Sequence, residues 1–485
     1  MSRREVCNGV SAALQEKRWG EAASRLAELS RLGGVAKVGA LQRWVRDADA
    51  ARHEDEVASF ALLWLLCRVA AGEPAAVPRE PVAVVRFDPW EPCERRPNLG
   101  GGPAERSASV SSFFVAHTEK ALERQPPNRY DLRIWTSREV RTLAPATARR
   151  VEVGAVEGAF VLNGVLSVGE CRELLDIATQ LGFEPDEPLD PDQRDRLALA
   201  AARTKGAFAA LADDDDDLDD PEPRTNLKTG VSERSKTVVW LADAALNEGL
   251  FERCRSHLPQ TYDDCRDARG RAVGRAELCG LNARWRLYRY DAGGTYRPHV
   301  DGAWPASALD SAGNYVYDAF GDRLSKLTAV VYLNDDFSGG TTAFYSAADD
   351  NTLRVFGVTP RAGSVLFFPH GDAAGSLIHE GSNVASGSKY IIRTEVLYKW
   401  GSSSSSSSYP SSRNHGRART STTPFVALEH PSSGARRHDE DSLRDNNKRP
   451  SATTMTATSS KKKRSRRQLK RPPSSIIDKP RPRVI

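Results

Sequence analysis

Between Cys279 and Trp400 the sequence contains four runs of β-branched and aromatic residues, and this pattern constrains the fold more than any other. The runs are ARWRLYRY, LTAVVYLN, SVLFFP and KYIIRTEVLY, and glycine-containing turns separate them. Such runs between turn residues predict β-strands. Upstream, residues 151–183 predict a strand, a turn and a helix, with Ser167 as N-cap and Glu170 completing a capping box. Helices before several short strands predict an α+β fold whose strand-rich half is a double-sheet jelly roll.

Composition divides the chain into four regions. Residues 1–75 predict a helical N-terminal region, because apolar residues recur at helical spacing in two or three predicted helices. We interpret it as a small bundle or helical-repeat cap, with a partner-docking module as the alternative. Residues 76–148 are rich in Pro, Gly and Arg and predict a partly ordered linker. Residues 149–400 form the main domain, with its core at about 279–400, and residues 401–485 predict a disordered Ser-rich, basic tail.

The cysteines and the apolar segments indicate a compartment. The seven cysteines are scattered and form no CxxC pair, which fits neither a disulfide framework nor a zinc ribbon. The N-terminus continues into an amphipathic helix without an apolar leader, so we expect no secretory signal. No stretch reaches the roughly 18 uninterrupted apolar residues that a membrane span needs. We therefore expect an intracellular protein that is neither secreted nor bound to a membrane.

Charge is unevenly distributed along the chain. The formal net charge is +5, but residues 401–485 carry 19 Lys and Arg against 6 Asp and Glu, which leaves −8 for the first 400 residues. In the tail, Lys448-Arg449, a Ser/Thr-rich spacer and the basic run 461–464 have the layout of a bipartite nuclear-localisation signal. We therefore expect a nuclear import receptor as partner and a nuclear location, with the cytoplasm as the alternative location. Nonspecific contact with nucleic acid or with an acidic protein is the alternative interpretation of the same charges. The acidic run 213–217 predicts an exposed surface loop.

A His-x-Asp motif at His299-Val300-Asp301 is the candidate metal site. Non-haem Fe(II) oxygenases hold iron with two imidazoles and one carboxylate, which leaves the opposite face open. In a strand or its exit loop, positions i and i+2 point the same way, so both side chains can reach one ion. The motif alone is weak, because His53-Glu54-Asp55, His117-Thr118-Glu119 and His438-Asp439-Glu440 are similar. We interpret those three as accidental and rely on the context of His299.

That context is an ordered series of motifs. It reads RLYRYDAGGTYRPHVDG, then LTAVVYLNDDFSGGTTAFY, then PRAGSVLFFPHGDAAGSLIHEGSNVASGSKYIIRTEVLYKW. The series resembles the prolyl-4-hydroxylase-like branch of the Fe(II)- and 2-oxoglutarate-dependent dioxygenases, a family with a double-stranded β-helix catalytic domain. The PRAG element departs slightly from the family's Pro-x-x-Gly, because its Gly directly precedes the strand. The resemblance continues weakly back to Val151 and covers neither the first 148 residues nor the tail.

The resemblance implies an iron site. By position in the family pattern, His299, Asp301 and His379 bind Fe(II). His370 is the rival for the distal position, but it follows directly on the strand SVLFFP, whereas the family's distal His begins a His-Glu-Gly segment. We therefore expect His370 at the surface or behind the ligands.

The resemblance also implies 2-oxoglutarate as cosubstrate and ascorbate as an accessory. The far carboxylate of 2-oxoglutarate needs a buried cation, because an unpaired buried charge is too costly. Lys389 lies ten residues past His379, the spacing of the prolyl-4-hydroxylase branch, while Arg393 lies on the same strand face and stays open as the alternative. Tyr290 and Tyr332 match positions where relatives place tyrosines that hydrogen-bond the cosubstrate; core packing is the alternative for both.

The function implied is hydroxylation of a substrate, with conversion of 2-oxoglutarate and O₂ to succinate and CO₂. A prolyl residue of an intracellular protein is the expected target, since the motifs resemble the prolyl branch. A nucleic-acid demethylase of the same superfamily is one alternative, and the basic tail favours it superficially. A nuclear scaffold with an inactive oxygenase fold is the other, and the intact ligand set argues against it.

Overall fold

The computed structural model describes residues 2–33, 36–93, 109–124, 127–187, 189, 235–267, 270–371 and 375–401. The acidic run 213–217, His438 and the tail with its predicted localisation signal lie outside these residues, as do the predictions made for them. None of the described helices is long and apolar enough to span a membrane.

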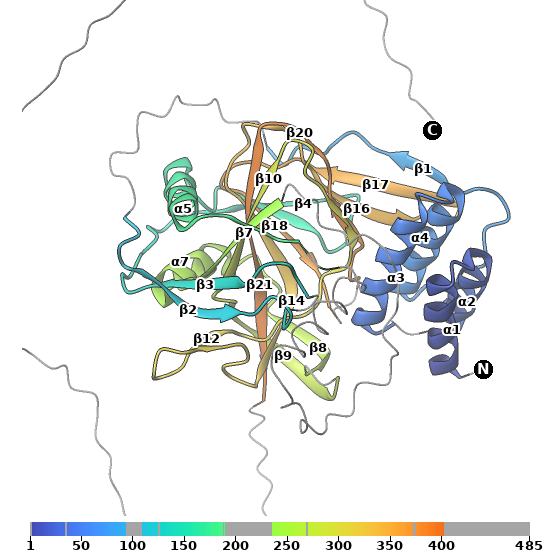
Figure 1. Ribbon diagram of the computed structural model, residues 1–485, viewed down its shortest axis with the longest axis horizontal. Helices are drawn as coiled ribbons and strands as arrows, with labels where there is room; N and C mark the ends of the chain where they lie inside the picture. The colour runs from blue at the N-terminus through green and yellow to red at the C-terminus, as the bar shows by residue number, and fades with distance from the viewer. Residues whose placement is uncertain are drawn as a thin grey trace, which may run out of the picture. The chain divides into compact units, whose positions relative to one another are not determined.

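Two sheets form the strand-rich part of the chain (Figure 1). The smaller sheet has the order β1 (Ala83–Arg86), β17 (Thr352–Val358), β16 (Thr342–Ala347), β19 (His379–Gly381), β11 (Tyr296–His299). The larger sheet has the order β2 (Phe113–Glu119), β3 (Leu132–Ser137), β7 (Ser235–Leu241), β10 (Arg284–Asp291), β21 (Ser388–Trp400), β14 (Arg323–Tyr332), β18 (Val365–Pro369), β5 (Phe160–Asn163), β4 (Arg149–Glu152).

Short strands extend these sheets or form small ones. On the larger sheet, β6 (Glu184–Pro185) pairs with β7, and the hairpin of β8 (Thr261–Arg266) and β9 (Ala272–Leu281) joins β21 through β9. Two separate pairs are β12 (Ala308–Leu309) with β13 (Tyr315–Val316) and β15 (Ser338–Gly339) with β20 (Val384–Ser386).

The two sheets share an apolar core between their inner faces. Tyr288, Tyr332 and Phe368 of the larger sheet cluster with Phe344 and Val358 of the smaller one. Because side chains alternate along a strand, the intervening residues of the larger sheet point to its other face. The arrangement is the predicted double-stranded β-helix within an α+β fold.

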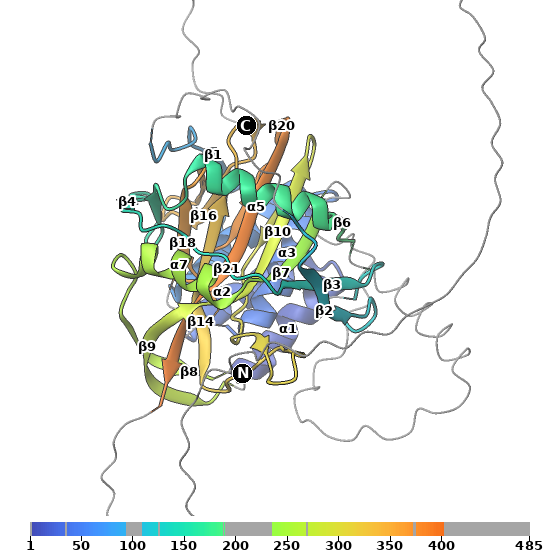
Figure 2. The same ribbon diagram turned by 90° about the vertical axis from the view of Figure 1, so that its left-hand side faces the viewer.

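Helices cover the outer face of the larger sheet. Leu174 and Ile177 of α5 (Val168–Leu181) and Leu246 of α7 (Ala244–Arg255) belong to one buried cluster with Trp285 and Ile392. Figure 2 shows both helices lying across this sheet. The predicted capping box at the start of α5 is present, with both reciprocal hydrogen bonds formed.

The described residues of the N-terminal region form four helices, so the prediction of two or three was wrong. They are α1 (Arg3–Gln15), α2 (Trp19–Arg31), α3 (Val38–Ala51) and α4 (Glu56–Ala71). The breaks are short: Lys17 adopts a positive φ of 57° between α1 and α2, and Asp55 caps α4. Apolar periodicity does not reveal such breaks. Helices α3 and α4 lie on the smaller sheet, where α3 contacts β11 and α4 contacts β16 and β17 (Figure 1). Helices α1 and α2 pack against α3 and α4 from outside.

The described part of residues 76–148 is built into both sheets and is not a linker. β1 pairs in parallel with β17 at the edge of the smaller sheet. β2 and β3 form a hairpin, and β3 pairs in parallel with β7. Sequence composition concealed β1 and β2 because edge strands tolerate flanking Pro and Gly. It did not reveal the pairing of β1 and β3, because their partners β17 and β7 lie far away along the chain.

Gly363, the glycine of the PRAG motif, lies directly against the backbone of Leu166, which follows β5 of the larger sheet. Its φ is +78°, and a Cβ there would lie 2.0 Å from the carbonyl oxygen of Leu166. We therefore expect Gly363→Ala to lower the free energy of unfolding by about 3 kcal/mol. Gly313 also has a positive φ but open space around it, so Gly313→Ala should cost only about 1 kcal/mol. Equal losses in denaturant unfolding would contradict the steric account.

Candidate metal centre

Two histidines face each other across neighbouring strands of the smaller sheet. His299 is the last residue of β11, His379 is the first residue of β19, and the antiparallel register pairs them directly. Their ring centroids lie 4.2 Å apart. Both side chains line a pocket that lies between the two sheets, with further lining residues from β10, β14 and β21 of the larger sheet and from β16 of the smaller one.

Asp301 completes a cluster with metal-binding geometry. Its Oδ1 lies 3.5 Å from His299 Nε2 and its Oδ2 lies 3.7 Å from His379 Nε2. The three ligand atoms all lie within 4.8 Å of one another, so they could bind one ion. No other such group occurs within the described residues; His53 lies in an exposed turn, and His117 of β2 stacks on Tyr315.

Both imidazoles are oriented for coordination through Nε2. Nδ1 of His299 lies 2.8 Å from the carbonyl oxygen of Arg297, and Nδ1 of His379 lies 3.1 Å from that of Leu377. A proton on Nδ1 therefore donates to the backbone, and the lone pair of Nε2 is directed at the cluster. Burial lowers the pKa of His379 to about 3, which keeps this ring neutral.

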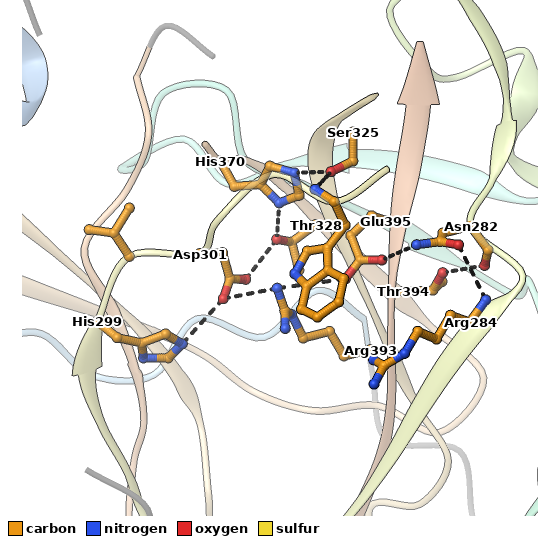
Figure 3. Close-up of polar contacts among 12 residues, drawn as sticks. Asn282, Arg284, His299, Asp301, Ser325, Thr328, His370, Arg393, Thr394 and Glu395 are labelled. Carbon is orange, nitrogen blue, oxygen red and sulfur yellow. Dashed lines mark hydrogen bonds and ion pairs between the residues drawn. The ribbon is translucent and has the colours of Figure 1, made fainter. Parts of the chain in front are cut away.

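Asp301 is held from two sides. Its carboxylate is buried, Oδ1 lies 3.2 Å from Nη2 of Arg393, and Oδ2 accepts a 2.7 Å hydrogen bond from Thr328 Oγ1 (Figure 3). Burial alone would raise the pKa of this carboxyl, but the charge of Arg393 and the contact with His299 outweigh burial and hold the pKa well below its usual range. Asp301 is therefore an anion, as a metal ligand must be.

His370 lies behind Asp301 and is not part of the ligand cluster. It is fully buried, with Nδ1 2.6 Å from Thr328 Oγ1 and Nε2 2.7 Å from Ser325 Oγ. Thr328 gives its one hydroxyl proton to the carboxylate, so His370 must donate from Nδ1 and accept from Ser325. Ser325 Oγ in turn accepts the N–H of Trp304. His370 was expected either at the surface or behind the ligands, and the structure places it behind them.

Arg393 is engaged with carboxylates of the protein itself. Besides Asp301, its Nη2 lies 3.6 Å from Oε1 of Glu395, which is buried and accepts a 3.0 Å hydrogen bond from Nδ2 of Asn282. Burial raises the pKa of Glu395, while the positive charge of Arg393 opposes this shift. Figure 3 shows the resulting chain of contacts from Asn282 through Glu395 and Arg393 to Asp301. Asn282 therefore contacts the cluster only through Glu395 and Arg393.

Lys389 is buried in the same pocket without a carboxylate partner among the described residues. Its side chain is 3% exposed, and Nζ donates a 2.7 Å hydrogen bond to the carbonyl oxygen of Gly340. Nζ also lies 5.9 Å and 5.6 Å from the ring centroids of Tyr290 and Tyr332. Burial lowers the pKa of Lys389 to about 7. A buried cation of this kind favours an anionic ligand.

Of the two tyrosines expected near the cosubstrate, one lines the pocket and the other lies behind its wall. Tyr290 lines the pocket. The hydroxyl of Tyr332 forms a 2.8 Å hydrogen bond with Oγ1 of Thr342, and Thr342 lines the pocket. Arg286 of β10 does not contact the cluster and pairs with Asp186 at 2.5 Å. The full lining is Tyr288, Tyr290, Tyr296, His299, Asp301, Val330, Thr342, His379, Glu380, Gly381, Ser382, Val384, Lys389, Ile391 and Arg393.

Sequence reasoning missed Thr328 and Ser325, the two hydroxyls that connect His370 to the carboxylate of Asp301. Both occur in β14, which is otherwise apolar around Thr328. The signal that could have identified one of them is a lone threonine among Leu, Ala and Val in a strand expected to be buried, because a buried hydroxyl needs a hydrogen-bond partner.

Comparisons with known proteins identify a family for the part of the chain that carries this geometry. Residues 285–394 match the 2OG-Fe(II) oxygenase superfamily, a stretch from β10 to β21 that contains all three cluster residues and Lys389. Comparison with curated proteins gives no match.

The chain is also similar to several solved structures. One is a viral collagen prolyl hydroxylase of Paramecium bursaria Chlorella virus-1 (16% identity, TM-score 0.23, covering 51% of this chain and 99% of that one). Another is a prolyl hydroxylase of Trichoplax adhaerens in complex with a peptide of hypoxia inducible factor (15%, 0.27, 51% and 84%). A third is HygX of Streptomyces hygroscopicus with nickel, 2-oxoglutarate and hygromycin B (14%, 0.26, 51% and 84%).

Proposed function

We propose, from the premise that residues 285–394 match the 2OG-Fe(II) oxygenase superfamily, that the chain is an Fe(II)- and 2-oxoglutarate-dependent dioxygenase acting on prolyl residues of a protein. The observation that carries the proposal is one pocket that combines a His-Asp-His cluster with a buried lysine. The cluster suits a metal ion, and the lysine suits a carboxylate. A dicarboxylate cosubstrate could bind the metal ion with one end and the lysine with the other.

His299, Asp301 and His379 would hold the iron. When bound, Fe(II) with 2-oxoglutarate and O₂ supplies oxidative decarboxylation to succinate and CO₂ and the oxygen that hydroxylates the substrate. The protein's own part is to keep two imidazoles and one carboxylate directed at one point. The backbone carbonyls of Arg297 and Leu377 fix the imidazoles, and Thr328 and Arg393 fix the carboxylate.

Lys389 would anchor the far carboxylate of 2-oxoglutarate. Its ammonium group has a carbonyl partner and no ion pair within the described part of the chain, so its burial is costly until an anion arrives. Arg393, the alternative anchor, already contacts Asp301 and Glu395. Tyr290 lines the pocket beside Lys389, while the Tyr332 hydroxyl is engaged with Thr342 and supports the wall.

A prolyl substrate is the finer part of the proposal. Support comes from the Lys389 spacing of the prolyl-4-hydroxylase branch and from Tyr288, Tyr290 and Tyr296, whose rings line the pocket and suit a small apolar ring. The net charge of −8 on the first 400 residues disfavours a nucleic-acid substrate, since phosphates would be repelled. Ascorbate is proposed as the accessory reductant that the resemblance implies.

Succinate formation tests the proposed function. Purified protein with Fe(II), 2-oxoglutarate and ascorbate should produce succinate, and a proline-containing protein substrate should increase the rate. His299→Ala and Asp301→Ala should abolish the product, because each removes a ligand of the cluster. If these variants form succinate at the wild-type rate, the cluster is not the reaction centre. If the wild-type protein binds neither Fe(II) nor 2-oxoglutarate, the inactive-scaffold alternative is favoured.

The choice of Lys389 as anchor predicts a specific loss. Lys389→Met should raise the dissociation constant of 2-oxoglutarate about 100-fold, because the far carboxylate loses its buried counter-charge, while metal affinity stays nearly unchanged. Arg393→Met, on the same strand face, is the matched control and should mainly weaken metal binding through Asp301. Calorimetric titration of both variants with 2-oxoglutarate and with metal ion distinguishes the two assignments. If Arg393→Met loses 2-oxoglutarate affinity and Lys389→Met does not, the anchor is Arg393.

The pH dependence provides a second readout of the same assignment. Because burial lowers the pKa of Lys389 to about 7, the lysine is largely neutral above that pH until a carboxylate binds. Binding then takes up a proton, so 2-oxoglutarate affinity should fall as pH rises above about 7. Lys389→Arg, which stays charged, should bind with little pH dependence in this range. A wild-type affinity that does not change with pH would contradict the assignment.

A further inference from the structure

The strands that carry the two histidines have a second face, and the N-terminal helices cover it. Next to the ligands, Val300 and Ile378 are 1% and 2% exposed and belong to the same buried cluster as Leu41 and Trp44 of α3. The segments that carry the metal cluster on one side therefore pack against the N-terminal helices on the other. None of these helices lies within residues 285–394, the stretch that matches the oxygenase family.

Helix α3 makes polar contacts with the segment that contains His299 and Asp301. Nε2 of Gln42 donates a 2.9 Å hydrogen bond to the carbonyl oxygen of Val300, the residue between the two ligands. The same nitrogen is so close to Gly302 that a Cβ there would lie 3.2 Å away. Gln42 thus touches the backbone on both sides of Asp301.

A second contact lies just before His299. Asp49 follows Gln42 by about two turns of α3, which places both side chains on the same face of the helix. Asp49 forms an ion pair with Arg297, and its side chain is 9% exposed, so the pair is largely protected from solvent screening. The carbonyl of Arg297 is the group that fixes the His299 ring. One contact of α3 therefore lies just before the His-x-Asp motif, and the other lies within it.

We infer that α3 is a positioning element of the metal centre, with Gln42 and Asp49 as its positioning residues. This inference rests on the proposed function, because it needs the His-Asp-His cluster to bind a metal. Gln42 fixes the peptide between the ligands, and Asp49 fixes the residue whose carbonyl orients His299. The N-terminal helices thus have a task in this chain beyond covering the smaller sheet.

Helix α4 offers a matched control. Nε1 of Trp64 donates a 3.0 Å hydrogen bond to the carbonyl oxygen of Ala348. Ala348 lies in the turn between β16 and β17, and neither of these strands carries a cluster residue. Trp64→Phe and Gln42→Met each remove one hydrogen bond from an N-terminal helix to a backbone carbonyl, and only the second bond is at the ligands.

Titration of the full-length, metal-free protein with Co(II) tests the inference, since the visible absorption of bound Co(II) reports both affinity and coordination geometry. Gln42→Met should weaken Co(II) binding about tenfold and alter the spectrum. Asp49→Asn should act in the same direction, and Trp64→Phe should match wild type. Thermal unfolding of each metal-free variant shows that it is folded before titration.

Three results would overturn the inference. Wild-type affinity and spectrum in both Gln42→Met and Asp49→Asn would show that α3 does not position the ligands. An equal loss in Trp64→Phe would show that the helices act only through general stability. Failure of the wild-type protein to bind Co(II) would remove the metal site itself, and with it both the proposed function and this inference.

Discussion

The antiparallel register between β11 and β19 is the constraint on which the site depends. It sets His299 directly opposite His379, so both imidazoles extend from the same side of the smaller sheet. A shift of one residue would turn one of them to the other face. Asp301 comes after β11 has ended, where no strand ladder fixes it. Its backbone carbonyl is held by the N–H of Gly371 at 3.0 Å, and its side chain is held by the larger sheet.

Of the two buried cations of the pocket, Arg393 has carboxylate partners and Lys389 has none among the described residues. Asp301 and Glu395 are both buried, and Arg393 lies between them. Asn282 gives Glu395 a further hydrogen bond, so both carboxylates have partners within the protein. Lys389 is four residues from Arg393 on the same strand, yet within the described structure it has only a neutral carbonyl partner. Burial of an ammonium in that state is unfavourable, which makes the pocket receptive to an anion.

Much of the fold and the cluster could be predicted from the sequence. β-Branched and aromatic runs between turn glycines predicted the strand-rich half, and the motif series selected His299, Asp301 and His379 over similar histidines. The choice between Lys389 and Arg393 could not be made, because both point to one face and only tertiary contacts separate them. Likewise β1 and β3 pair in parallel with strands distant in the chain, and no local pattern reports such pairing.

The measurement that tests the proposed site most directly is a crystal structure of the protein with Mn(II), as a stand-in for Fe(II), and 2-oxoglutarate. We predict Mn(II) bound by His299, Asp301 and His379, with the far carboxylate of 2-oxoglutarate within hydrogen-bond distance of Lys389 Nζ. A carboxylate bound by Arg393 instead, or a metal ion held by His370, would contradict this prediction.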